Sequence, residues 1–80
     1  MVINFGVRVV DQNGDPVEGA DVAVQYPWAF EHTWTDKDGW VRIEKNTAFG
    51  NSIFATIYVD GVVRDSGLWI EDERTFTYAV

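Results

Sequence analysis

Short runs of alternating apolar and polar residues, broken by turn-forming residues, constrain this chain more than any other feature. Along residues 3–9, every second side chain is a large apolar one, and the residues between them are Asn4, Gly6 and Arg8. Successive side chains of a β-strand point to opposite faces of its sheet, so this alternation predicts a strand with one buried face. The buried face is predicted to consist of Ile3, Phe5, Val7 and Val9.

The same period of two recurs along the rest of the chain. The pattern predicts six further strands, near residues 20–26, 32–35, 40–45, 52–59, 62–70 (irregular) and 74–80. Turn signals such as "DQNGDP", "DKDG", "FGN" and "DSG" separate these runs, and no stretch shows a helical period over a dozen residues. Val occurs 12 times, Ile 5 times and Leu once, which is the residue choice of pleated sheets. We therefore expect an all-β fold, a single seven-stranded, mainly antiparallel β-sandwich over residues 1–80.

Charge and composition exclude several classes of function. The formal net charge of −7 disfavours nucleic-acid binding, because phosphate contacts need a basic surface. The chain has no cysteine, so neither a disulfide nor a thiolate nucleophile is possible. No stretch approaches the roughly 20 apolar residues of a membrane span, so no membrane insertion is expected. The N-terminal residues lack the features of a signal peptide, so any targeting segment of an exported protein would lie outside this sequence.

Two aspartate- and glycine-containing segments are predicted to be tight turns. Gly14 and Gly39 can supply the positive φ that such turns need, and the carboxylates of Asp11 and Asp36 can accept nearby backbone N–H groups. The first segment also places Asp11, Asn13 and Asp15 at the spacing of three calcium ligands. Pro16, however, stands where an EF-hand loop needs glycine, and no helix flanks the segment. We expect structural turns and no metal or other cofactor.

These turns also carry a resemblance to a known group of domains. The matching residues are Asp11, Gly14, Pro16, Val17, Gly19 and Ala20 in the first turn, and Thr35, Asp36, Asp38 and Gly39 in the second. Over roughly residues 5 to 61, the pattern resembles transthyretin-like, carboxypeptidase-regulatory-like domains and the related immunoglobulin-like domains of bacterial surface adhesins. The resemblance implies an accessory, spacer or adhesion module of a larger exported or cell-surface protein.

The residue types that could support catalysis are few. His32 is the only histidine, and Ser52 and Ser66 are the only serines. A nucleophile–histidine–acid site needs three groups in contact around a shaped pocket, and nothing in this spacing indicates one. We expect no catalytic residues and no enzyme activity.

The aromatic residues are the most informative candidates for a binding site. If Val41 faces the core, the alternation places Trp40 outside, and the same rule turns Phe54 and Tyr58 outward. Trp34 has two possible positions. In a hairpin with a three-residue loop at 37–39 it shares the face of Trp40, whereas a four-residue loop at 36–39 buries it.

The predicted loop at 26–32 adds two further aromatic residues, so the candidate ligand-binding surface consists of Trp28, Phe30, Trp34 and Trp40. Three interpretations of this surface are open at the level of sequence. The rings pack under loops or against a neighbouring domain, they form an interface with another protein or a second copy, or they hold a polysaccharide. We therefore expect a non-catalytic structural, spacer or adhesion module, with carbohydrate or protein binding as the alternative.

Overall fold

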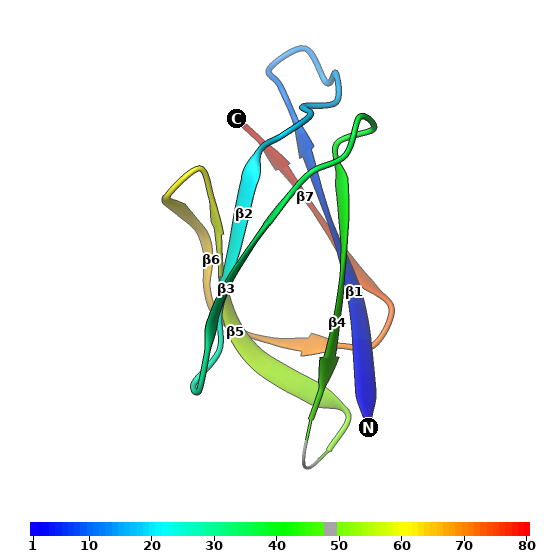
Figure 1. The fold of residues 1–80 in the computed structure, drawn as a ribbon, viewed down its shortest axis with the longest axis vertical. Helices are drawn as coiled ribbons and strands as arrows, with labels where there is room; N and C mark the ends of the chain where they lie inside the picture. Colours follow the sequence, from blue (N-terminus) through cyan, green and yellow to red (C-terminus); the bar gives the residue numbers. More distant parts are fainter. Residues whose placement is uncertain (48–49) are drawn as a thin grey trace.

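The computed structural model describes residues 1–47 and 50–80, and this part of the chain is all β. Its seven strands are β1 (Val2–Val10), β2 (Asp21–Gln25), β3 (Phe30–Trp34), β4 (Trp40–Asn46), β5 (Ser52–Val59), β6 (Val62–Glu71) and β7 (Arg74–Ala79). The predicted seven-stranded, two-sheet architecture is confirmed (Figure 1). The predicted turn at 49–51 begins at Phe49, which lies outside the described residues. Within residues 1–47 and 50–80, no helix could cross a membrane.

The strands form two sheets that pack face to face. One has three strands in the order β4-β1-β7, and the other has four in the order β3-β2-β5-β6. All neighbours are antiparallel except β1 and β7, the first and last strands, which run parallel from the pair Phe5–Arg74 to the pair Val10–Ala79. The fold is therefore mainly antiparallel, as predicted, with its two terminal strands joined directly.

The core lies between the sheets and follows the alternation of the sequence. The four predicted core residues of β1, which are Ile3, Phe5, Val7 and Val9, are fully buried. The inward residues of β2 and β5 are buried as well, and so is Tyr26 directly after β2; they include Val22, Val24, Ile53, Ile57 and Val59. Burying a side chain of this size contributes about 1.5–3 kcal/mol, so these residues account for most of the driving force for folding.

The predicted connection between the third and fourth strands is wrong in two respects. β3 begins at Phe30, whereas the sequence predicted a loop up to residue 32. β3 and β4 also belong to different sheets, so no hairpin forms and neither of the two loop alternatives for Trp34 occurs.

At the crossover, directly after β3, lies Thr35, which is only 4% exposed. Its hydroxyl donates to the carbonyl of Val17 at 2.6 Å and accepts from the N–H of Ala20 at 2.9 Å. These bonds hold the end of β3 to the segment before β2, and the chain then turns into the other sheet.

Both predicted aspartate turns are confirmed. Oδ1 of Asp11 accepts the backbone N–H groups of Asn13 and Asp15, at 2.8 and 3.0 Å. Oδ1 of Asp36 accepts those of Asp38 and Trp40 in the same way, at 2.9 and 3.0 Å.

Glycine is required most strictly at position 39. Gly39 has a φ of +77°, and a Cβ added there would lie 2.5 Å from the carbonyl oxygen of Val9. Val9 also bonds to this turn through its N–H group, which donates to the Gly39 carbonyl oxygen at 2.8 Å. The turn is thus packed directly against the backbone of β1.

The two ends of the chain lie at opposite ends of an elongated molecule. The domain measures 39 × 21 × 16 Å, and Figure 1 shows Met1 near one end of the long axis and Val80 near the other. The parallel pairing of β1 and β7 dictates this arrangement, because the start of one strand and the end of the other must then lie at opposite edges.

Candidate functional site

The four aromatic residues predicted as a ligand surface are all exposed. Relative exposures are 61% for Trp28, 51% for Phe30, 61% for Trp34 and 37% for Trp40. They do not form one continuous surface, because Trp40 lies on β4 and the sheet of β4 is not the sheet of Phe30 and Trp34. The structure therefore divides the predicted set between the outer faces of two sheets and the loop before β3.

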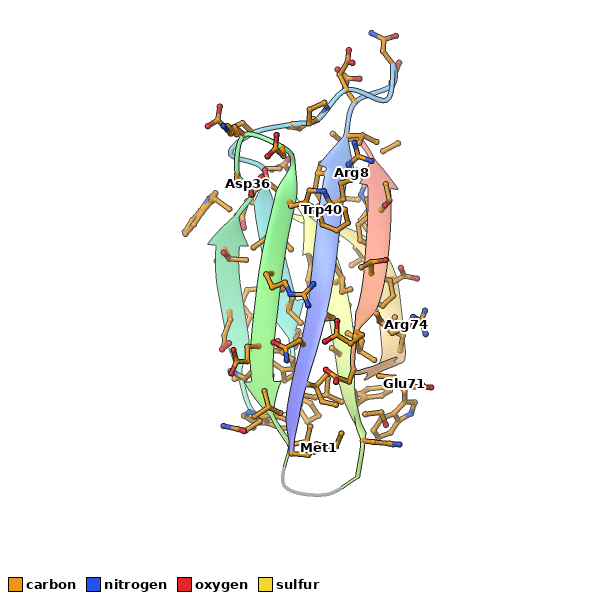
Figure 2. The ribbon with its side chains drawn as sticks, turned by 90° about the vertical axis from the view of Figure 1, so that its right-hand side faces the viewer. Met1, Arg8, Asp36, Trp40, Glu71 and Arg74 are labelled. Carbon is orange, nitrogen blue, oxygen red and sulfur yellow. The ribbon has the colours of Figure 1, made fainter. Side chains whose placement is uncertain are left out.

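Trp40 packs on the outer face of the three-stranded sheet, as its place in the alternation predicted. A Cβ added to Gly6 would lie 3.2 Å from Cζ3 of Trp40, so the glycine lets the indole lie against β1. The guanidinium carbon of Arg8 lies 6.0 Å from the ring centroid, and Figure 2 shows the two side chains together near one end of this sheet. Asp36 and Arg42 line the hollow of about 330 Å³ beside the ring.

The outer face of the four-stranded sheet carries a group of touching rings. The Phe30 centroid lies 5.0 Å from that of His32 and 5.6 Å from that of Tyr58, both in edge-on arrangements. The Tyr58 hydroxyl donates to Oε1 of Gln25 at 2.7 Å. These contacts across β3, β2 and β5 hold the rings in fixed orientations.

Phe54 on β5 and Trp69 on β6 extend this face to the opposite edge of the sheet. Their ring centroids are 5.1 Å apart, and Trp69 is 63% exposed. Phe54 reaches over Gly67 of β6, where an added Cβ would lie 3.2 Å from Cζ of the ring. The sequence predicted the outward orientation of Phe54 and Tyr58, and the structure confirms it.

Trp69 was missed in the sequence because β6 is irregular. The pairing of β5 with β6 shifts register on both sides of Ile57, which breaks the period of two. The apolar residue Ile70 was the available signal: if it faces the core, as the structure shows, its neighbour in the strand faces outward.

Two shallow hollows meet beside these rings. The first, of about 200 Å³, lies between Trp28 and Trp69 and is also lined by Pro27, Thr47, Ser52, Ile53 and Phe54. The second, of about 240 Å³, is lined by Gln25, Tyr26, Pro27, Phe54 and Thr56. Pro27 and Phe54 belong to both, so the hollows are adjacent. We call this surface, defined by Pro27, Trp28, Phe54 and Trp69, the aromatic hollow.

Trp28 is held in place at the aromatic hollow by a residue of the core. Its ring stacks on that of Tyr26, with centroids 5.7 Å apart and planes inclined by 16°. Tyr26 is only 3% exposed. One face of the indole is thus supported while most of the side chain remains accessible.

A fourth hollow opens between the edges of β3 and β4 and has a different character. It has a volume of about 200 Å³, and charged residues line it, including Glu31, Arg42 and Glu44. The Tyr26 hydroxyl at its inner side is buried and has no hydrogen-bond partner among the described residues. Burial, and then the charge of Glu31, raise the pKa of Tyr26. Lys45 pairs with Glu31 and joins the two sheets across this opening.

The residues considered for catalysis and for metal binding have structural contacts of their own. Nδ1 of His32 lies 2.8 Å from Oδ1 of Asp21, and both side chains are partly exposed on the outer face of the sheet. In the described ranges, no group of three or more His, Asp or Glu residues is placed to hold a metal ion. Asp11, the first of the three residues at calcium-ligand spacing, bonds to the backbone of its own turn.

Comparison with known proteins supports the fold alone. No family model matches the sequence, and a search of curated proteins also finds no match. Among solved structures, the domain is similar to part of the Bacillus anthracis TIE protein, with a TM-score of 0.73 and 11% sequence identity. The similarity covers 98% of this chain and 16% of that chain. At this identity, the likeness shows a shared β-sandwich fold.

Proposed function

We propose that this domain is a non-catalytic spacer module within a longer exported or cell-surface protein. The observation that carries the proposal is the placement of the chain ends at opposite ends of the 39 Å axis (Figure 1). Domains with this geometry can be joined head to tail in a series, and each adds its full length to the chain. The domain matches only 16% of the length of the similar solved chain, which supports a role as one module among several.

The pairing of the terminal strands suits such a module to carry tension. A force on Met1 and Val80 would pull β1 and β7 along their lengths in opposite directions. The ladder between them extends over six residue pairs, and the Val80 N–H adds a bond to the Val10 carbonyl at 2.9 Å. These bonds lie across the direction of pulling, so they are loaded together rather than one at a time.

The architecture also fits the more specific kinship suggested by the turn motifs. We place the domain with the transthyretin-like, carboxypeptidase-regulatory-like and adhesin-type immunoglobulin-like modules, whose turn residues it shares at positions 11–20 and 35–39. Its partners would then be the neighbouring domains of the same chain or another surface protein.

Single-molecule pulling of a tandem array of this domain tests the proposal. With about 3.4 Å per extended residue, each unfolding event should lengthen the chain by about 230 Å. We expect discrete events of this length. Their forces should exceed those of a control that is pulled between a cysteine introduced in the turn at residues 60–61 and a cysteine introduced at Val80. Equal forces for the two geometries, or unfolding without resolved events, would contradict a load-bearing spacer.

A further inference from the structure

We propose that the aromatic hollow binds a neutral polysaccharide. The inference concerns a surface that the spacer role does not use, and it stands or falls independently of that role. It rests on the identity of the residues that line the hollow, on their exposure and on their charge.

The hollow is open and flat-sided, and its rings are held in place. Trp28 and Trp69 are each more than 60% exposed, and both line the first part of the hollow together with Pro27 and Phe54. Trp28 is supported by Tyr26, and Phe54 by Gly67. A sugar ring presents an apolar C–H face, which can stack on such a ring without the side chain first having to be ordered.

The hollow is uncharged, although the protein is strongly acidic. Asp, Glu, Lys and Arg make up 24% of the chain, yet none of them lines either part of the hollow in the described structure. The hollow beside Trp40 and the hollow between β3 and β4 both contain charged residues. An uncharged surface on a protein of net charge −7 is complementary to a neutral ligand, whereas the field of the whole protein repels polyanions.

Two groups that can bind a hydroxyl, the side chains of Gln25 and Thr56, line the second hollow. Gln25 uses its side-chain oxygen to accept from Tyr58, which leaves its amide nitrogen to donate to a ligand. The Thr56 oxygen accepts from the N–H of Gly67 at 2.9 Å, which leaves its O–H to donate. An apolar surface with a few such groups is the usual composition of a small-ligand site.

The arrangement of the two hollows favours a polymer over a single sugar. They lie side by side and share Pro27 and Phe54, and each is smaller than the ~300 Å³ of a drug-sized pocket. Consecutive units of one chain can occupy both, with Trp28 and Trp69 lining the first hollow and Gln25 and Thr56 lining the second. A protein partner or a second copy is the competing occupant.

Native affinity electrophoresis tests the proposal. The protein is run through gels that contain hydroxyethylcellulose, xylan, galactomannan or laminarin, with polygalacturonate as the anionic comparison. We expect retardation by at least one neutral polysaccharide and none by polygalacturonate. Trp69→Ala and Trp28→Ala should each weaken the retardation about tenfold, as loss of a central aromatic contact does. The matched control is Trp40→Ala, which removes an indole from the opposite sheet and should leave retardation unchanged.

Thermal unfolding of each variant ensures that only folded proteins are compared. Lack of retardation by all four neutral polysaccharides would overturn the proposal, as would an equal effect of Trp40→Ala and Trp69→Ala. Analytical ultracentrifugation tests whether a second copy of the chain occupies the hollow instead. Self-association that Trp69→Ala abolishes, without any retardation, would assign the hollow to a second copy of the chain.

Discussion

The hydroxyl of Tyr78 donates a 2.6 Å hydrogen bond to Oδ2 of Asp65. Tyr78 belongs to β7 of the three-stranded sheet and Asp65 to β6 of the four-stranded sheet, so this bond joins the two layers. The acceptor is a carboxylate, and hydrogen bonds to charged groups contribute about 1.5–3 kcal/mol. Tyr78→Phe should therefore lower the free energy of unfolding by about 2 kcal/mol, measured by urea denaturation. Asp65→Asn keeps an acceptor in place and should cost less. A Tyr78→Phe protein as stable as the parent would contradict this assignment.

Tyr26→Phe, unlike Tyr78→Phe, should not lower the free energy of unfolding. The Tyr26 hydroxyl is buried without a hydrogen-bond partner among the described residues, whereas its ring is stacked on Trp28. Removal of an unsatisfied buried polar group recovers a desolvation cost of about 1–3 kcal/mol, and the ring contacts remain. We expect equal or greater stability in urea denaturation. A loss of more than about 1 kcal/mol would mean that an ordered water bonds the hydroxyl.

The same two tyrosines should make the protein sensitive to alkaline pH. Burial is the main cause that raises the pKa of both, reinforced by the Glu31 charge at Tyr26 and by the hydrogen bond to Asp65 at Tyr78. Below about pH 10, both states keep these protons, and stability is independent of the two groups. Above it, the unfolded chain releases them first, so stability falls as pH rises, by at most ~1.4 kcal/mol per pH unit for each tyrosine.

Urea denaturation between pH 8 and about pH 11.5 measures this effect, and the Tyr26→Phe, Tyr78→Phe double variant is its control. The double variant should show a flatter profile. Ultraviolet titration of the folded parent should show both phenols resisting ionisation at about pH 10. Identical pH profiles for parent and double variant would contradict the assignment.

Gly39 and Gly14 offer a matched test of the two turns. Both have positive φ, +77° and +84°, but an added Cβ meets the Val9 carbonyl oxygen only at Gly39 and finds open space at Gly14. Gly14→Ala should cost about 1 kcal/mol, the strain of a left-handed backbone. Gly39→Ala adds a backbone clash and should cost about 3 kcal/mol or more. Thermal unfolding of the two variants compares them directly. Equal costs would contradict the close packing of the second turn on β1.

The sequence was sufficient for the features that depend on neighbouring residues. The alternation in β1 and β5 identified buried side chains such as Phe5 and Ile57, because a strand has only two faces and one of them must be apolar. The aspartate turns were also predictable, since Asp11 and Asp36 bond to backbone groups only two and four residues away. The start of β3 was missed because Pro27 and Trp28 gave the whole segment the character of a loop.

The aromatic hollow, by contrast, could not be predicted from the sequence. Trp28 and Trp69 lie 41 positions apart in the chain, and nothing local indicates that they border one hollow. The bulges in β6 obscured which side Trp69 faces, because an extra residue reverses the alternation from that point onward. Trp34 and Trp40, by contrast, are close in sequence, yet the crossover after Thr35 separates them onto different sheets.

In the regular strands such as β1 and β5, local alternation thus determined which side chains enter the core, because that choice follows from the geometry of each strand alone. Which strands become neighbours depended on long-range packing. β4 pairs with β1 and not with β3, and the pairing of β7 with β1 places the two chain ends at opposite ends of the molecule. Those partnerships also decide which exposed rings meet, since an outward side chain finds its neighbours on adjacent strands and not along its own.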